Sequence, residues 1–174
     1  MYYRLIINIF LIAWLVIFQL SFIRALPGWF MYLDIIIVLL VYIISLAKLR
    51  TIWWWVIGTG VLLDFLAFTP FGLHLLSISV MAAVVYYLKN SYFTNRSLYS
   101  FLALTISATL SYRLLLGLLN IITALAVSAP MDAFISQFFW LVQGRIIVMN
   151  MIFSVLFFYL IIIFTKRYRP VFID

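Results

Sequence analysis

Six long apolar stretches, separated by short charged or turn-forming segments, dominate this sequence and limit the kind of fold it can adopt. Hydrophobic residues make up 69% of the 174-residue chain and charged residues only 9%, whereas ordinary globular domains are about 25% charged. So few polar residues do not cover the surface of a soluble protein. A helix that crosses a bilayer needs about 20 mainly apolar residues. The sequence therefore predicts an all-α polytopic membrane helical bundle, with residues 1–174 forming a single integral membrane domain.

Charged residues, prolines and glycines bound each apolar stretch and so define the predicted spans. The six predicted spans are Arg4–Phe22, Trp29–Leu46, Ile52–Phe68, Leu73–Leu88, Leu98–Val127 and Phe134–Thr165. The last two are longer than one perpendicular crossing, so we expect them to tilt, kink or extend past the membrane. The first is long for a signal peptide and no A-x-A-like cleavage site follows it, so we expect an uncleaved span.

The distribution of lysine and arginine predicts how the spans are oriented. If the N-terminus is cytoplasmic, the loops on that side carry most of the basic residues: Arg4, Lys48, Arg50, Lys89, Arg96, Lys166, Arg167 and Arg169. The outer side carries only Arg24, and cytoplasmic loops of membrane proteins are enriched in Lys and Arg. We therefore expect a multi-pass protein of a bacterial cytoplasmic membrane with both termini in the cytoplasm. The net charge of +7 then reflects topology and indicates no nucleic-acid partner.

Four charged residues lie inside the predicted spans, where an unpaired charge is costly. They are Asp34, Asp64, Arg113 and Arg145. Counted along the helices, all four fall toward the outer half of the bilayer, so pairing would cancel their charges. We hypothesise a polar cluster that joins the second, third, fifth and sixth spans, in which Asp64 pairs with Arg113 or Arg145.

Helical spacing places further polar or small residues beside these charges. The fifth span carries one such stripe, which consists of Thr105, Thr109, Arg113, Gly117 and Asn120. In the third span, Gly60 and Asp64 share a face. The stripes are either the inward sides of a tight bundle or the lining of a ligand pocket or partner site.

Catalytic and metal-binding patterns are weak in this sequence. The chain has no cysteine and one histidine, His74, so thiolate ligands and a multi-histidine metal site are excluded. A set of Ser77 or Ser79 with His74 and Asp64 lacks any nucleophile-elbow motif. We expect no enzymatic activity, no catalytic residue and no cofactor.

One segment resembles a known family. Gly60, Asp64, Pro70, Gly72 and His74 lie in a pattern of a glycine, an apolar run ending in aspartate, and a short turn into the next span. This pattern resembles a segment of the bacterial rod-shape-determining MreD family. The size, the basic balance and the six predicted spans are similar to that family as well. The residues named here, with Asp34, Arg113 and Arg145, are the candidate partner-binding or structural cluster.

The resemblance implies a non-enzymatic scaffold of the bacterial cell-elongation complex, which supports lateral peptidoglycan synthesis. Its implied partners are a MreC-like membrane protein, MreB, RodA and a class B penicillin-binding transpeptidase, besides the lipid bilayer. It also implies a fold similar to the S component of energy-coupling-factor transporters. The alternative function is therefore a vitamin-binding S component, which the lack of a small-residue motif in Leu5–Leu20 disfavours. A small channel or transporter is a third reading, although no selectivity-filter sequence is present.

Overall fold

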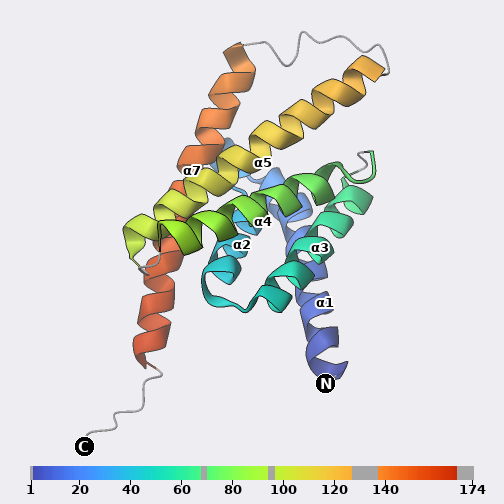
Figure 1. Ribbon diagram of the computed structural model, residues 1–174. Helices are drawn as coiled ribbons and strands as arrows, with labels where there is room; N and C mark the ends of the chain where they lie inside the picture. The colour runs from blue at the N-terminus through green and yellow to red at the C-terminus, as the bar shows by residue number, and fades with distance from the viewer. Residues whose placement is uncertain (1, 68–69, 94–96, 127–136, 168–174) are drawn as a thin grey trace, which may run out of the picture.

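The computed structural model describes residues 2–67, 70–93, 97–126 and 137–167, and within these ranges it is built of helices and short turns (Figure 1). The described residues form these α-helices: α1 (Tyr2–Ile17), α2 (Ile35–Leu46), α3 (Leu49–Leu66), α4 (Leu73–Ser91), α5 (Leu98–Ala126) and α7 (Gln137–Arg167). The predicted all-α class is therefore confirmed for the described residues. The predicted span ends Phe68, Val127 and Phe134, and the basic residues Arg96 and Arg169, lie outside the described residues.

Helical segments long and apolar enough to cross a bilayer number five among the described residues. They are Ile7–Ala25, Leu49–Leu66, Leu73–Ser91, Leu98–Leu125 and Trp140–Ile161. The first joins α1 to a π-helical turn, η1 (Phe18–Phe22), and a 3-10 turn, η2 (Ile23–Ala25). Such a set of helices is typical of a multi-pass membrane protein.

The second predicted span is not one continuous helix, and that prediction is corrected. A 3-10 turn, η3 (Gly28–Tyr32), precedes α2, and Leu33 and Asp34 between them have non-helical backbone. Pro27 and Gly28, whose φ is 72°, mark the start of η3, and the break itself lies at Leu33 and Asp34. At about 1.5 Å per residue, the 12 residues of α2 extend about 18 Å, less than the roughly 30 Å of a hydrocarbon core. A sixth crossing therefore needs η3 and α2 together.

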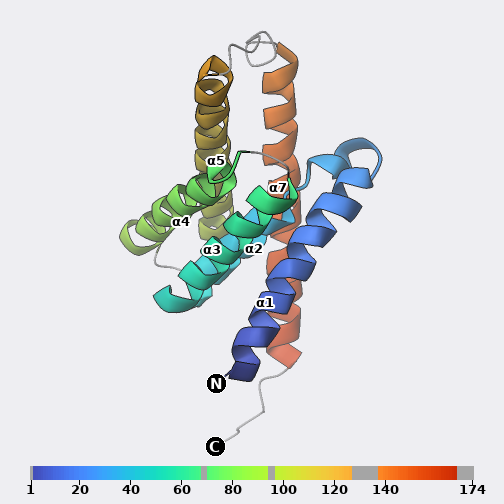
Figure 2. The same ribbon diagram turned by 90° about the vertical axis from the view of Figure 1, so that its right-hand side faces the viewer.

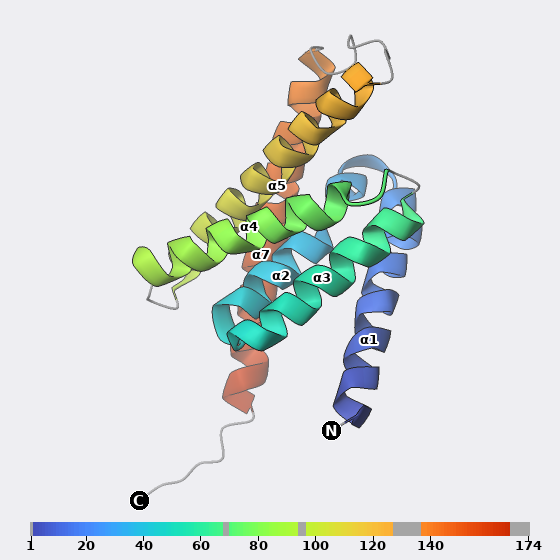
Figure 3. The same ribbon diagram turned by 45° about the vertical axis from the view of Figure 1, so that its right-hand side comes forward.

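The short helix α2 forms the centre of the bundle. It packs against α3, α4, α5 and α7, and Val38, Val41 and Ile44 on it are completely buried. A helix that is apolar all round is expected where other helices enclose it. Figure 3 shows α2 behind α3 and α4 and in front of α7, so its position depends on contacts with most of the chain.

The chain begins and ends on the same side of the bundle in the described residues. Figures 1 and 2 show the start of α1 and the end of α7 at one end, with the α3–α4 turn toward the other. The C-terminal part of α5 and the N-terminal part of α7 stand beyond the remaining helices at that second end (Figure 2). The two long predicted spans are thus confirmed as long helices, of 29 and 31 residues.

Candidate functional site: two hydrogen-bonded helix starts

Asp64 closes the turn between α3 and α4. One carboxylate oxygen accepts the backbone N–H groups of Gly72 at 2.9 Å and Leu75 at 3.2 Å. The other accepts the N–H of His74 at 2.8 Å. The first N–H groups of a helix lack partners within it, and the helix dipole favours a negative charge there. Asp64, itself buried, therefore meets the needs of the α4 start from within α3.

Gly60, one helical turn before Asp64, lets α3 and α4 approach closely. A Cβ atom on Gly60 would lie 2.7 Å from the Cα and 2.9 Å from the Cδ1 of Leu75, which is too close for any larger residue without a shift of the helices. Gly72 has φ of 100°, a conformation that favours glycine. The exposed Pro70 accepts the N–H of Leu73 through its carbonyl at 3.4 Å. These residues together form one compact helical hairpin.

His74 ties this hairpin to α5. It is the second residue of α4 and is buried, and its Nδ1 lies 2.9 Å from the hydroxyl oxygen of Tyr112. The hydroxyls of Ser77 and Ser79 instead donate to the carbonyls of Leu73 and Leu75, each at 2.7 Å. His74 is thus oriented by a tyrosine on a neighbouring helix, and we call the five residues Gly60, Asp64, Pro70, Gly72 and His74 the turn site.

A second set of polar residues supports the break before α2. Gln19, buried in the π-helical turn η1, donates from its side-chain nitrogen to the carbonyl of Leu33 at 2.8 Å. Its amide oxygen accepts the N–H of Ile35 at 3.0 Å. A π-helical turn often marks a functional position, and here it places an amide against non-helical backbone that lipid could not satisfy.

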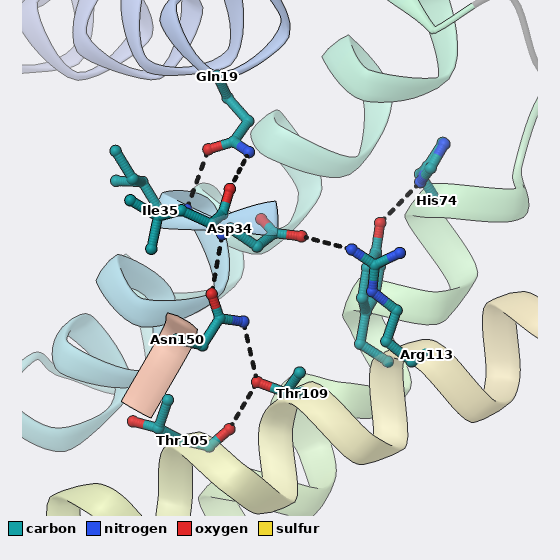
Figure 4. A network of polar contacts seen from close by, with 10 residues as sticks. Gln19, Asp34, Ile35, His74, Thr105, Thr109, Arg113 and Asn150 are labelled. Carbon is teal, nitrogen blue, oxygen red and sulfur yellow. Dashed lines mark hydrogen bonds and ion pairs between the residues drawn. The ribbon is translucent and has the colours of Figure 1, made fainter. Parts of the chain in front are cut away.

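Asn150 of α7 supports the same break from the opposite side. Its Oδ1 accepts the backbone N–H of Asp34 at 2.8 Å, and its Nδ2 donates to the Thr109 hydroxyl oxygen at 3.2 Å. That hydroxyl donates in turn to the Thr105 carbonyl at 2.9 Å, so a chain of hydrogen bonds connects α2, α7 and α5 (Figure 4). Asn150 and both threonines are fully buried, which makes their satisfaction important.

The Asp34 carboxylate forms an ion pair with Arg113. The Oδ2 of Asp34 lies 3.5 Å from the Nη2 of Arg113, with 15% and 29% of the two side chains exposed. Figure 4 shows Asp34 between Gln19, Asn150 and Arg113. We call Gln19, Asp34, Arg113 and Asn150 the helix-break site. Tyr112 and Arg113 are neighbours on α5, so consecutive residues contact the turn site and the helix-break site.

The expected pairing of Asp64 with an arginine is therefore wrong. Its carboxylate is used by three backbone N–H groups, whereas Asp34 is the partner of Arg113. Arg145 joins neither pair. Its Nη1 donates to the Tyr32 hydroxyl oxygen at 3.4 Å, and its guanidinium carbon lies 5.6 Å and 5.7 Å from the ring centres of Trp29 and Tyr32. The predicted cluster is thus divided into separate groups.

Sequence reasoning missed Gln19, Asn150, Tyr112 and the aromatic partners of Arg145. The available signal for the first two is a neutral amide inside an apolar span, because such a group needs a hydrogen-bond partner there. Nothing in the sequence shows which backbone groups these amides meet, since their partners lie up to 116 positions away.

Comparison with models of known protein families, with curated proteins and with solved structures finds no match to this chain. Its function is therefore argued from its own residues. The arrangement holds helices together and leaves long apolar helix faces exposed, especially on α5 and α7.

Proposed function

We propose that this chain is a non-enzymatic membrane scaffold of the bacterial cell-elongation complex, of the MreD type. In this role it sits in the cytoplasmic membrane with both termini inside and binds a MreC-like protein beside MreB, RodA and a class B penicillin-binding transpeptidase. The observation that carries the proposal is the turn site. Gly60, Asp64, Gly72 and His74 each have a physical part in one rigid hairpin, which explains why these residue types occur together in the segment that resembles the family.

The rigid interior suits a scaffold because it fixes the outer helix faces relative to one another. Asp64 joins α3 to α4, His74 joins α4 to α5, and Asn150 joins α7 to α2 and α5. Buried networks with satisfied partners restrict a core to one arrangement. A partner that packs on this surface would then meet helices held at constant angles.

The α5 ridge is the surface that we propose for the partner. Its exposed apolar residues recur at intervals of three or four along one face: Leu110, Leu114, Leu118, Ile122 and Leu125. The ridge continues into the part of α5 that stands beyond α1–α4 (Figure 1), so these four helices do not cover it there. We propose that the single membrane helix of a MreC-like protein packs along it, as an apolar helix does on a complementary face.

Cross-linking tests this surface cleanly because the chain has no cysteine. Leu118→Cys on the α5 ridge and Leu156→Cys on α7 are matched, since each leucine is 57% exposed. With the MreC-like protein of the same organism co-expressed, we expect a cross-link from position 118 and little from position 156. Equal cross-linking from both positions, or none from position 118, would contradict the proposed surface.

Depletion in a rod-shaped host tests the function itself. We expect rounded cells after depletion, and recovery of rods when the wild-type chain is restored. Purification in mild detergent should recover the chain with a single-span membrane protein. Cells that stay rod-shaped after depletion would count against a scaffold of the elongation complex.

The S-component alternative keeps one specific observation in its favour. Among the described residues, Arg113 Nε and Gln143 Oε1 are buried without a hydrogen-bond partner, and a small polar ligand between α5 and α7 would satisfy such atoms. Mass spectrometry of the purified, denatured protein separates the two functions. A stoichiometric small molecule supports the transporter component, and its absence together with a co-purified membrane protein supports the scaffold.

A further inference from the structure

Arg145 differs from Asp34, Asp64 and Arg113 in how its charge is met. Asp64 is bound by backbone N–H groups and Asp34 pairs with Arg113. Among the described residues, no carboxylate lies within ion-pair distance of Arg145. Its neighbours are the Tyr32 hydroxyl and the rings of Tyr32 and Trp29. Aromatic rings hold and orient a guanidinium but do not neutralise it, so the described neighbours of Arg145 leave its positive charge in place.

The position of Arg145 along α7 places this charge near a bilayer surface. Within the membrane-crossing segment Trp140–Ile161, Arg145 lies five residues from the N-terminal end, a rise of about 8 Å along the helix. Side chains of a helix also lean toward its N-terminus, so the guanidinium of Arg145 lies toward the headgroups.

The residues around Arg145 are of the types found at the depth of the lipid headgroups. Trp29 is 55% exposed, and tryptophan and tyrosine favour this depth of a membrane. Gly144 beside Arg145 is exposed and has open space at its Cβ position, which leaves room for a bound group. Below it, exposed apolar residues continue along α7 at helical spacing, and they are Val148, Ile152 and Leu156.

We propose that Arg145, framed by Trp29 and Tyr32, binds the phosphate of an anionic lipid headgroup, with an acyl chain of that lipid lying along Val148, Ile152 and Leu156. Arginine suits this ligand because its planar guanidinium donates two parallel hydrogen bonds to phosphate oxygens. The site lies in the leaflet at the η3 end of the bundle. It does not depend on the proposed scaffold function, since any membrane role is compatible with it.

Native mass spectrometry of the full-length protein tests this site with phosphatidylglycerol and phosphatidylcholine of identical acyl chains. The wild type should retain phosphatidylglycerol in preference to phosphatidylcholine, and Arg145→Gln should lower that retention about tenfold, the loss expected for one charge-assisted contact. Arg24→Gln is the control, because Arg24 is an exposed arginine in η2, which packs against η3. It should keep at least half of the wild-type retention.

Two further arms identify the source of the phosphate and guard against misfolding. Soluble glycerophosphoglycerol and inorganic phosphate, which lack acyl chains, should not displace the lipid at equal concentration. Arg145→Lys, which keeps the charge but not the planar fork, should fold as the wild type and retain an intermediate amount of lipid. Equal retention of the two lipids, no effect of Arg145→Gln, or displacement by soluble phosphate would overturn the proposal. So would loss of a co-purified acidic protein, instead of lipid, in the Arg145 variants.

Discussion

The start of α4 and the start of α2 meet the same physical need in different ways. Both expose backbone N–H groups in an apolar interior, where each unsatisfied donor costs about 1–3 kcal/mol. At α4 a single carboxylate, Asp64, accepts three donors from eight to eleven positions away. At α2 two neutral amides, Gln19 and Asn150, accept one donor each from 16 and 116 positions away. The first solution is local and the second joins the two ends of the chain.

The two sets of residues therefore hold different parts of the bundle. Loss of the turn site releases α4 from α3, which are neighbours along the chain. Loss of the helix-break site releases α1 and α7 from the central helix α2, because Gln19 belongs to η1 and Asn150 to α7. The turn site should therefore dominate local stability, whereas the helix-break site should dominate the association of the terminal helices.

The largest expected effect comes from Asp64→Ala. It leaves three N–H donors at the α4 start without their acceptor, so we expect a loss of about 3 kcal/mol or more in the free energy of unfolding. Asp64→Asn keeps one acceptor oxygen and should lose less. Unfolding in mixed detergent micelles measures both variants. An unchanged Asp64→Ala protein would contradict the assigned role of the carboxylate.

Gly60→Ala should lower the free energy of unfolding by about 1–3 kcal/mol, the usual cost of overpacking. The added methyl group would lie 2.7 Å from the Leu75 Cα, so α3 and α4 must move apart. Gly117→Ala on α5 is the matched control because nothing lies within 4 Å of its Cβ position. It should be neutral or stabilise by up to about 1 kcal/mol. The same loss in both variants would show that α3–α4 contact is not the cause.

Asn150→Ala should cost about 1–2 kcal/mol, since it leaves one N–H donor of Asp34 unsatisfied. Gln143→Leu on the same helix is the control, because the Gln143 Oε1 has no partner among the described residues and its removal should be neutral or stabilising. Limited proteolysis should also show α7 released in Asn150→Ala before α3 and α4. If α4 is cleaved first, the two sites do not hold different parts of the bundle.

The smallest effect belongs to Tyr112→Phe. It removes only the hydroxyl that contacts His74 Nδ1, and one neutral hydrogen bond contributes about 0.5–1.5 kcal/mol. In a His74→Leu background, the same substitution should have no further effect on the melting temperature. A full additional loss in that background would assign the Tyr112 hydroxyl a different partner.

The sequence predicts the helical class and most helix positions because each membrane-spanning helix corresponds to a continuous apolar run. It also singles out Gly60, Asp64, Pro70, Gly72 and His74, which lie close together along the chain, but it does not predict that Asp64 accepts the N–H groups at the start of α4. It does not predict the break at Leu33 and Asp34, because Trp29–Leu46 is apolar across that point. The break depends on hydrogen bonds from distant helices, and a sequence pattern carries no information on which helices meet.

The charge assignments illustrate the same limit. Counting residues from the bilayer surface placed four charges in one half of the bundle, but it did not distinguish the possible partners. Asp64 was expected to pair with an arginine, and the α4 N–H groups were the better partners because they lie in the next turn of chain. Arg113 pairs with Asp34, 79 positions away.

A pair of double-mutant cycles tests the division between the two sites most directly. The cycles combine Arg113→Gln with Asp34→Asn and, separately, with Asp64→Asn, and the free energy of unfolding is measured for each variant. We expect Asp34 and Arg113 to couple by roughly 1 kcal/mol, a value moderated by their partial exposure. Asp64 and Arg113 should be additive within about 0.5 kcal/mol. Stronger coupling of Arg113 to Asp64 than to Asp34 would contradict the account.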